Sequence, residues 1–267
     1  MSVLEDIILG VRDDIERRKE SVPLEEVKRQ AVLAEPAIDV VKHFSSHFPY
    51  ISLIAECKRS SPSKGVLASI DDPGALASIY EKAGASAISV LTEERRFHGS
   101  LADFDAVRAN VSIPVLRKDF IVDPYQIWEA RAHGADFLLL IVAALDDVLL
   151  KSYLDLIHAL GMKALVEVHT EEEIERALAL GAHIIGVNTR NLKTLDVDIT
   201  TFERLAPFIP EEKVLVGESG VKTLEDVSYY AYHGADAVLV GESLVTSNDT
   251  YAFVQQISQV KIGQGNK

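Results

Sequence analysis

The sequence is poor in cysteine, in metal-ligand motifs and in long apolar runs. Cys57 is the only cysteine, which excludes an internal disulfide and a cysteine-cluster metal site and suits a reducing compartment. The eight histidines show no HExxH spacing, so a metal is not indicated. No apolar run approaches the about 20 residues of a membrane span. These absences predict a cytoplasmic chain that needs neither a metal nor a membrane.

Positive charge is also scarce. Asp and Glu number 41 against 27 Lys and Arg, for a formal net charge of −14, and no basic cluster exceeds the patch Arg17-Arg18-Lys19. Nucleic acids bind clustered positive charge, so a nucleic-acid partner is not expected. The first ten residues lack the basic and then apolar order of a signal peptide. With 48% apolar residues, the chain is long enough for one large core or two modest domains.

One pattern recurs four times along the chain. Each copy is a Gly-Ala pair followed by an apolar run, and the runs are 87–91, 137–142, 184–187 and 237–240. Glycine supplies the left-handed residue that ends a helix, and a continuous apolar run is typical of a parallel strand buried on both faces. The copies lie about 50 residues apart, which fits two strand-helix units for each copy.

Four further strand-like runs fall between these copies, at 51–58, 114–118, 163–168 and 213–217. Eight alternating units with short connections predict an α/β fold, the closed (βα)8 TIM barrel. An open doubly wound sheet is the alternative, but its edge strands should differ from its central ones, so the fourfold regularity favours closure. We expect one barrel domain over residues 1–267.

Residues 1–49 precede the barrel and are expected to form a helical extension. Apolar residues recur at helical spacing in the first part, at Val3, Ile7, Ile8, Val11 and Ile15. Pro23 then opens a second helical run from 24 to 33. Such helices cover either the bottom of a barrel or its mouth, and both positions stay open at this point.

Polar residues stand at the ends of the predicted strands. Glu56 and Lys58 end the first strand and share the face of Ile54, because side chains alternate along a strand. Burying this pair without partners costs several kcal/mol, so it is either a compensated ion pair or a chemical site. Other strand ends carry Lys118, Glu167, Asn188, Glu218 and Glu242. Strand ends meet at the mouth of a barrel, so these groups are expected to converge there.

The loops after the last two strands have the features of a phosphate site. Ser219-Gly220 and Gly241-Glu242 each place a small residue and backbone N–H groups at the top of neighbouring strands, where many barrels bind phosphate. Backbone donors bind phosphate without a large cation. A lone glycine more often makes only a turn. Two in adjacent strands favour phosphate, and Lys58 is a further candidate anchor.

Seven motifs cover almost the whole chain. They are IAECKRSSPSKG from Ile54, LTEERRFHGS from Leu91, PVLRKDFIVDPYQ from Pro114, ALVEVH from Ala164, IGVNTRNL from Ile185, GESG from Gly217 and LVGESL from Leu239. In this order they resemble the indole-3-glycerol phosphate synthase family of tryptophan biosynthesis. The resemblance implies a (βα)8 carboxy-lyase that converts 1-(2-carboxyphenylamino)-1-deoxyribulose 5-phosphate to indole-3-glycerol phosphate, with loss of carbon dioxide and water. It implies a small phosphorylated substrate and no cofactor.

The resemblance also implies a catalytic set. Lys118 is expected to be the general acid of ring closure, and Glu167 to stabilise charge and move protons. Glu56 and Lys58 are expected to assist the dehydration. Which lysine protonates which oxygen stays open, because an ammonium on a flexible stem serves equally as proton donor and as anchor. Asn188 is expected to contact the substrate and to organise Glu167.

Substrate-binding residues follow from the same resemblance. Ser61, Phe97 and Phe120 are expected to line the anthranilate pocket, and Arg190 to contact the substrate beside Asn188. The expected phosphate site consists of Lys58, Ser219, Gly220, Gly241 and Glu242, the last through its backbone N–H, because its carboxylate would repel the ligand.

Two other functions are considered beside this one. A phosphoribosylanthranilate isomerase would use a cysteine and an aspartate as its acid-base pair, and would not need a lysine on the third strand. A sensor that only binds a phosphorylated metabolite would be expected to carry a broken acid-base set, whereas Lys118 and Glu167 are both present. The chain is expected to act as a monomer or a weak homo-oligomer.

Overall fold

Eight parallel strands close into a barrel, in the order β1-β10-β9-β8-β7-β6-β5-β4. The computed structural model describes residues 3–61, 64–192 and 194–263. The barrel strands are β1 (Ser52–Cys57), β4 (Ala87–Leu91), β5 (Val115–Lys118), β6 (Phe137–Ile141), β7 (Lys163–Val168), β8 (Ile184–Asn188), β9 (Val214–Glu218) and β10 (Ala237–Val240). The predicted (βα)8 barrel is confirmed, and the sheet closes where β1 pairs with both β4 and β10.

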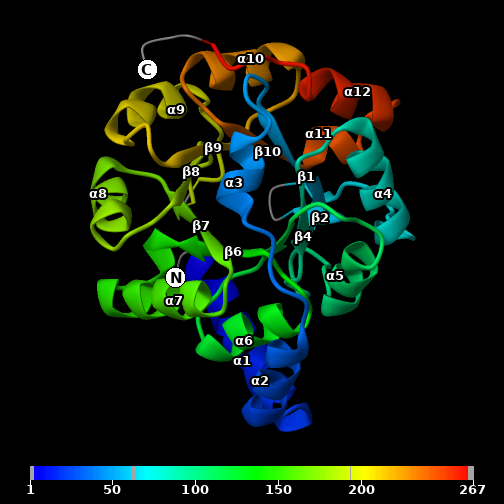
Figure 1. The fold of residues 1–267 in the computed structure, drawn as a ribbon, viewed down its shortest axis with the longest axis vertical. Coiled ribbons are helices and arrows are strands. Elements are labelled where there is room, and N and C mark those ends of the chain that lie inside the picture. The colour runs from blue at the N-terminus through cyan, green and yellow to red at the C-terminus, as the bar shows by residue number, and fades with distance from the viewer. Residues whose placement is uncertain (1–2, 62–63, 193, 264–267) are drawn as a thin grey trace.

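Helices surround the barrel (Figure 1). They are α4 (Pro73–Ala83), α5 (Leu101–Arg108), α6 (Pro124–Ala132), α7 (Asp147–Ala159), α8 (Glu171–Ala179), α9 (Thr200–Leu205), α10 (Leu224–Tyr232), α11 (Glu242–Val245) and α12 (Thr250–Ile257), with 3-10 turns η1 (Val142–Ala144) and η2 (Ala206–Phe208). Side-chain caps start several of them; Asp72, for example, accepts from the backbone N–H of Ala75. Gly84 ends α4 with φ 107°, the left-handed stop that the Gly-Ala pairs predict.

Two buried layers follow from the alternation of side chains. Ile54 points into the barrel, where it joins a cluster that includes Leu116 and Leu165. Its neighbours Ala55 and Cys57 point outward, into the layer between the strands and the surrounding helices. Each strand is therefore buried on both faces, which explains why its sequence is apolar at nearly every position.

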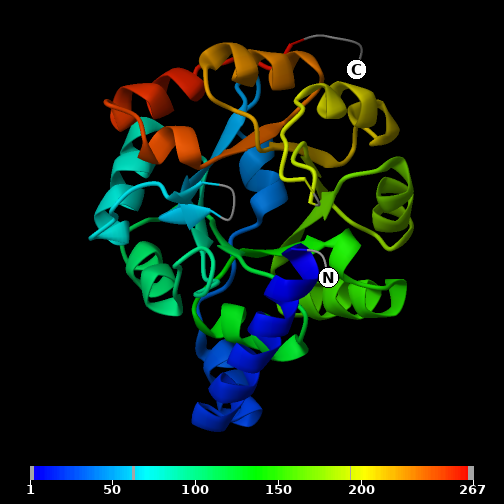
Figure 2. The ribbon, with the colours of Figure 1, turned by 180° about the vertical axis from the view of Figure 1, so that it is seen from behind.

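The extension contains α1 (Val3–Ser21), α2 (Leu24–Leu33) and α3 (Val40–Ser45). The first two helices agree with the predicted runs, whereas α3 was not predicted. Helix α3 closes the bottom of the barrel, because Phe44 packs on Phe137, the first residue of β6, with ring centroids 6.3 Å apart. Helix α1 lies over the opposite end, in front of the barrel in Figure 2, and α2 packs on α6. The extension thus covers both ends.

Ion pairs fasten α1 across the mouth. Asp14 is buried and accepts two hydrogen bonds, of 2.9 and 2.7 Å, from the guanidinium of Arg95 in the loop after β4. Further along α1, Arg18 donates to Glu129 of α6 at 3.0 Å, and Lys19 reaches Asp123 at 2.8 Å. These contacts are partly buried, so they are less screened than exposed pairs and hold α1 in one orientation.

A two-stranded hairpin, β2 (Ser60–Ser61) and β3 (Gly65–Val66), follows β1. Pro62 and Ser63, which belong to the first predicted loop motif, lie outside the described residues. Within the part of the chain that the structure describes, no helix is both long and apolar enough to span a bilayer.

Phe137→Ala should destabilise the folded protein by about 3 to 5 kcal/mol, because it empties a fully buried site where the bottom helix meets the barrel. The matched control is Phe208→Ala, since Phe208 is 48% exposed. Urea unfolding measures both. Equal midpoints for the two variants would contradict the assignment of α3 as a packed floor.

Candidate active site

Two adjoining pockets open at the carboxyl ends of the strands. One has a mostly apolar wall, formed by Leu4, Ile7, Phe97, Phe120, Leu139 and Ile141; we call it the apolar pocket. The other, the polar pocket, is lined by Glu56, Lys64, Glu218, Gly220, Gly241, Glu242 and Ser243 among others. They share Lys58, Lys118, Arg190 and Ser219. The apolar pocket encloses about 830 Å³, counting its open mouth, which is enough for a small organic ligand.

Every residue singled out from the sequence lines one or both pockets. The residues that line only the apolar pocket are Ser61, Phe97, Phe120, Glu167 and Asn188. The polar pocket receives Glu56, Gly220, Gly241 and Glu242. The shared wall consists of the remaining four, Lys58, Lys118, Arg190 and Ser219. Segments far apart in the sequence are thus brought to one mouth, while the roles of these residues remain proposals.

Glu56 lies between the two lysines. Its Oε1 is 3.4 Å from Nζ of Lys58, and its Oε2 is 3.7 Å from Nζ of Lys118. Ser89 donates a hydrogen bond of 3.3 Å to the same Oε2. Burial would raise the pKa of Glu56, but Lys118 and Lys58 outweigh burial and lower it. Glu56 is therefore a carboxylate that joins both ammonium groups.

The two lysines are shifted in opposite directions. Burial disfavours the Lys118 ammonium, but the carboxyl groups of Glu56, Glu218 and Glu167 outweigh burial and raise its pKa. For Lys58, burial lowers the pKa, and Lys118 and Arg190 add to the effect against the opposing Glu56. Lys118 is thus held as a charged proton donor, while Lys58 releases its proton more readily than an exposed lysine.

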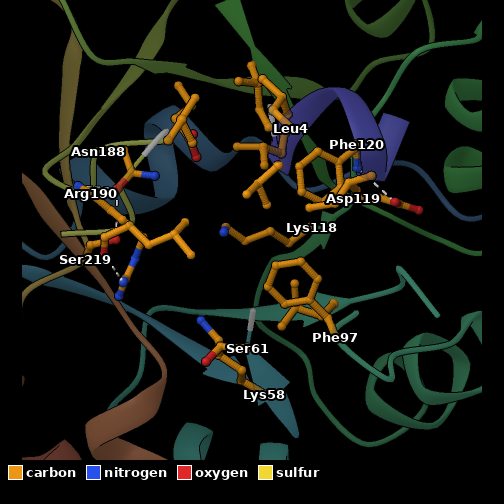
Figure 3. Close-up of a pocket in the computed structure, with 18 residues that line it drawn as sticks. Leu4, Lys58, Ser61, Phe97, Lys118, Asp119, Phe120, Asn188, Arg190 and Ser219 are labelled. Carbon is orange, nitrogen blue, oxygen red and sulfur yellow. Dashed lines mark hydrogen bonds between the residues drawn. The ribbon is translucent and has the colours of Figure 1, made fainter. Parts of the chain in front are cut away.

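Lys118 extends across the apolar pocket between two aromatic rings. Figure 3 shows its stem with Phe120 on one side and Phe97 on the other. The ring centroids of Phe97 and Phe120 are 6.1 Å apart, and Nζ of Lys58 lies 5.8 Å from the Phe97 centroid. A flat ligand that enters here meets apolar walls and a central ammonium.

Helix α1 contributes part of that wall, which the sequence analysis left undecided. Leu4 and Ile7 line the apolar pocket beside Phe97 and Phe120. The helical spacing of these residues predicts an apolar face, but spacing alone does not say which surface the face covers. The ion pairs of Asp14 and Arg18 decide it.

Asn188 organises the far side of the site. Its Oδ1 accepts from the Ser219 hydroxyl at 2.8 Å and from the backbone N–H of Arg190 at 3.0 Å. The Arg190 guanidinium donates to the carbonyl of Leu195 at 2.9 Å. These bonds join the ends of β8 and β9 and fix the orientation of the Ser219 side chain.

The sequence predicts Glu218 at the mouth, as one of the strand-end polar residues, but assigns it no catalytic or binding role. It ends β9, is 2% exposed, and its Oε1 has no hydrogen-bond partner among the described residues. Burial raises its pKa, and the nearby Glu167 and Glu56 carboxylates raise it further against the pull of Lys118. Alternation from Val214 and Val216 would have pointed Glu218 inward. The adjacent Ser219-Gly220 turn gave the stronger sequence signal, that of a phosphate site.

Glu167 is the buried carboxylate on the other side. Burial would raise its pKa, but His169 and then Lys118 outweigh burial and lower it. Glu167 and Glu218 are therefore driven apart, one toward the ionised and the other toward the protonated form. Two carboxyl groups with opposite shifts are the usual basis for separate base and acid roles.

The polar pocket ends at the loops after β9 and β10. Ser219 and Gly220 both have positive φ, 69° and 79°, a turn that directs successive N–H groups to one side. On the neighbouring strand, Gly241 precedes α11 and supplies no side-chain cap. The Glu242 carboxylate pairs with Lys64 across the opening. Its charge is thus partly compensated.

Within residues 3–61, 64–192 and 194–263, no group of three or more His, Cys, Asp or Glu side chains is placed to hold a metal ion. The pocket's reactive groups are lysines and carboxyls, which transfer protons directly.

A closed (βα)8 barrel with partly buried lysines and buried carboxyls at its mouth, beside glycine-containing loops, defines a barrel enzyme of acid-base type. Comparison with known proteins narrows this class. Residues 4–257 match the family model of indole-3-glycerol phosphate synthase, and the chain belongs to that family.

Close relatives carry the same description. The chain is 58% identical to the indole-3-glycerol phosphate synthase of Saccharopolyspora erythraea, over 96% of this chain and 95% of that one. It is 61% identical to that of Paenarthrobacter aurescens, over 93% of this chain and 92% of the relative.

Solved structures support the fold. The 3-hexulose-6-phosphate synthase of Salmonella typhimurium superposes with a TM-score of 0.64 at 17% identity, covering 79% of this chain and 98% of that one. The N-acetylmannosamine-6-phosphate 2-epimerase of Clostridium perfringens gives 0.58 at 18% identity, covering 72% and 86%. At such identities the likeness concerns the barrel alone.

Glu218→Gln should stabilise the protein increasingly as the pH rises. The pKa of Glu218 is raised above the about 4.3 of an unfolded chain, so between these values the folded wild type binds a proton that the unfolded chain has released. Wild-type stability therefore falls with pH through this window, and the variant lacks that fall. Urea unfolding from about pH 5 to about pH 8 measures the difference. The exposed Glu212→Gln is the control, and parallel curves for Glu218→Gln and wild type would contradict a raised pKa.

Proposed function

We propose that this chain closes an indole ring, as an indole-3-glycerol phosphate synthase of tryptophan biosynthesis. Its substrate is 1-(2-carboxyphenylamino)-1-deoxyribulose 5-phosphate, and its products are indole-3-glycerol phosphate, carbon dioxide and water. The observation that carries the proposal is the position of the Lys118 ammonium, inside an apolar pocket and surrounded by Glu56, Glu167 and Glu218. A flat aryl group and a charged proton donor meet there.

Ring closure needs an acid at the ketone. The aryl carbon that bears the carboxylate attacks the ketone carbon, a carbon-carbon bond forms, and the ketone oxygen takes up a proton. Lys118 is the proposed donor, because the surrounding carboxyls keep it charged and its stem crosses the apolar pocket. Loss of carbon dioxide then leaves its bonding electrons in the ring. The apolar walls of Phe97 and Phe120 favour this loss by keeping water from the carboxylate.

Dehydration needs acid and base again. The new hydroxyl leaves as water when it receives a proton, and a ring proton must be taken by a base. Lys58 and Glu56 are proposed for this step, since they are joined at 3.4 Å and the pKa of Lys58 is lowered. Glu167 is proposed as the carboxylate that accepts protons and stabilises positive charge, because it remains ionised beside Lys118.

The phosphate group is proposed to bind in the polar pocket. Ser219, Gly220, Gly241 and Glu242 offer backbone N–H groups there, and Lys58 adds positive charge. Arg190 lies on the wall shared by both pockets, and its backbone N–H donates to Asn188. In this proposal the aryl end of the substrate lies under α1 and the phosphate end over β9 and β10.

The alternative functions fit less well. An isomerase that used a cysteine would need Cys57 at the site, but Cys57 lies in the outer layer, where burial raises its thiol pKa to about 12. A sensor without chemistry would not require the Glu56 and Glu167 carboxylates to surround the Lys118 ammonium.

The activity is tested by incubating the purified chain with the anilino-ribulose phosphate and following indole fluorescence. Growth of that fluorescence with release of one carbon dioxide per product is the expected result. Binding of the substrate without product would favour the sensor, and a product without the indole spectrum would favour another barrel reaction.

Lys118→Ala should leave the fold intact and remove about 2 to 4 kcal/mol or more of transition-state stabilisation, because the ring-closing proton donor is lost. Lys151→Ala, which removes an exposed lysine paired with Asp155, is the matched control and should retain activity. Steady-state kinetics and circular dichroism measure both. An unfolded Lys118→Ala variant, or one with full turnover, would make Lys118 a structural residue.

Four broader properties belong to the same proposal. The chain is proposed to act in the cytoplasm, as a monomer or weak homo-oligomer, and without a nucleic-acid or membrane partner. Residues 1–267 are proposed to form one domain, of which 1–49 is the helical extension; its packing on both ends of the barrel supports this. Sedimentation of the purified chain tests the oligomeric state.

A further inference from the structure

His169 is a partly buried histidine beside the active site that the roles above do not use. Its Nε2 lies 3.3 Å from Oε1 of Glu167, and its Nδ1 lies 3.3 Å from Oε2 of Glu173. The side chain is 12% exposed. Toward Glu167 the contact has the distance of an ion pair rather than the geometry of a hydrogen bond. The ring therefore sits between two carboxyl groups, one of which faces the pocket.

The turn from β7 into α8 holds His169 in this place. Thr170 caps α8 by accepting from the backbone N–H of Glu173. The Glu173 carboxylate in turn accepts from the backbone N–H of His169 at 2.7 Å. Backbone and ring of His169 are thus both bound to Glu173, so the ring has little freedom to turn away from Glu167.

Charge accompanies this geometry. Burial would lower the pKa of His169, but Glu167 and Glu173 outweigh burial and raise it to about 10. The ring is then an imidazolium at neutral pH. Its charge lowers the pKa of Glu167, whereas Glu218, on which His169 acts only weakly, has a raised pKa.

We propose that His169 is a positioning residue: held by Glu173, it orients Glu167 and keeps it the ionised member of the two buried carboxyls, so that the proton resides on Glu218. The proposal rests on the proposed function in treating Glu167 as the catalytic carboxylate. The charged groups around His169 and Glu167 are Glu173 of α8, Lys118 of β5 and Glu218 of β9.

Without His169, Glu167 and Glu218 would have more similar surroundings, and neither would be clearly favoured as the ionised group. Both are buried, 2% exposed in each case, and both feel Lys118. Like charges at close range do not both stay ionised, so one of them takes up a proton. Only Glu167 has a cationic ring within ion-pair distance. His169 thereby selects which carboxyl acts as base.

His169→Gln should shift the acidic limb of the kcat/KM profile upward by about one pH unit, because Glu167 loses its cationic neighbour and is protonated more readily. At pH values below the shifted limb, kcat of His169→Gln should be about tenfold lower than that of the wild type, whereas KM should change much less. The matched control is His133→Gln, which breaks the pair between His133 and Asp105, an exposed contact on α6 and α5. This control should keep the wild-type profile.

Glu173→Gln is a second variant, in case His169→Gln fails to fold. Its amide oxygen still accepts from the His169 backbone, but the ring loses one negative neighbour. We expect a smaller shift of the limb in the same direction. Coinciding pH profiles of wild type, His169→Gln and Glu173→Gln would overturn the proposal, even if the variants were less stable.

A readout independent of turnover separates this inference from the proposed function. Imidazole NMR of the full chain, with His169→Gln used for assignment, should show His169 protonated well above the ordinary value of about 6.5. Glu167→Gln and Glu173→Gln should each lower its titration point. A ring that titrates near 6.5 in the wild type overturns the inference, whereas missing indole formation with a protonated ring overturns only the function.

Discussion

The site depends on one partly buried ammonium. Burial lowers the pKa of Lys118, and the surrounding carboxyls of Glu56, Glu218 and Glu167 outweigh burial and raise it. The carboxyls in turn need cations, which Lys58 supplies to Glu56 and His169 supplies to Glu167. No single pair is self-sufficient. Closure of the barrel is what brings these groups from separate strands to one dry mouth, so the chemistry and the topology depend on each other.

The sequence contains most of the fold. The apolar runs and the Gly-Ala pairs predict all eight barrel strands, because strands buried on both faces and glycine helix stops are local signals. The short helix α3 escaped because its six residues carry too little periodicity. The surface on which α1 packs could not be predicted from the sequence either. That choice rests on contacts of Asp14 and Arg18 with residues about 80 and 111 positions away.

The site was predictable to the extent that alternation and motifs point side chains inward. Lys58, Lys118 and Ser219 were placed at the mouth in this way, and the structure puts them on the wall shared by both pockets. Glu218 obeys the same alternation and was expected at the mouth, but its position in the sequence indicated no role. The contact of His169 with Glu167 was beyond reach, because it depends on side-chain rotation and on a cap in the next helix. Shifts of pKa follow from such distances and not from residue order.

Two glycines show what the carboxyls demand of their neighbours. A Cβ on Gly186 would collide with Oε1 of Glu218, and one on Gly241 would lie 2.6 Å from Oε1 of Glu56. Neither backbone has a positive φ, so glycine is not needed there for its conformational freedom. Glycine is needed there because it has no Cβ, which leaves room for the neighbouring carboxyl group. The reactive centre of this enzyme therefore also depends on positions without a side chain. A methyl group added at either glycine would displace a reactive carboxyl group before it disturbed the barrel.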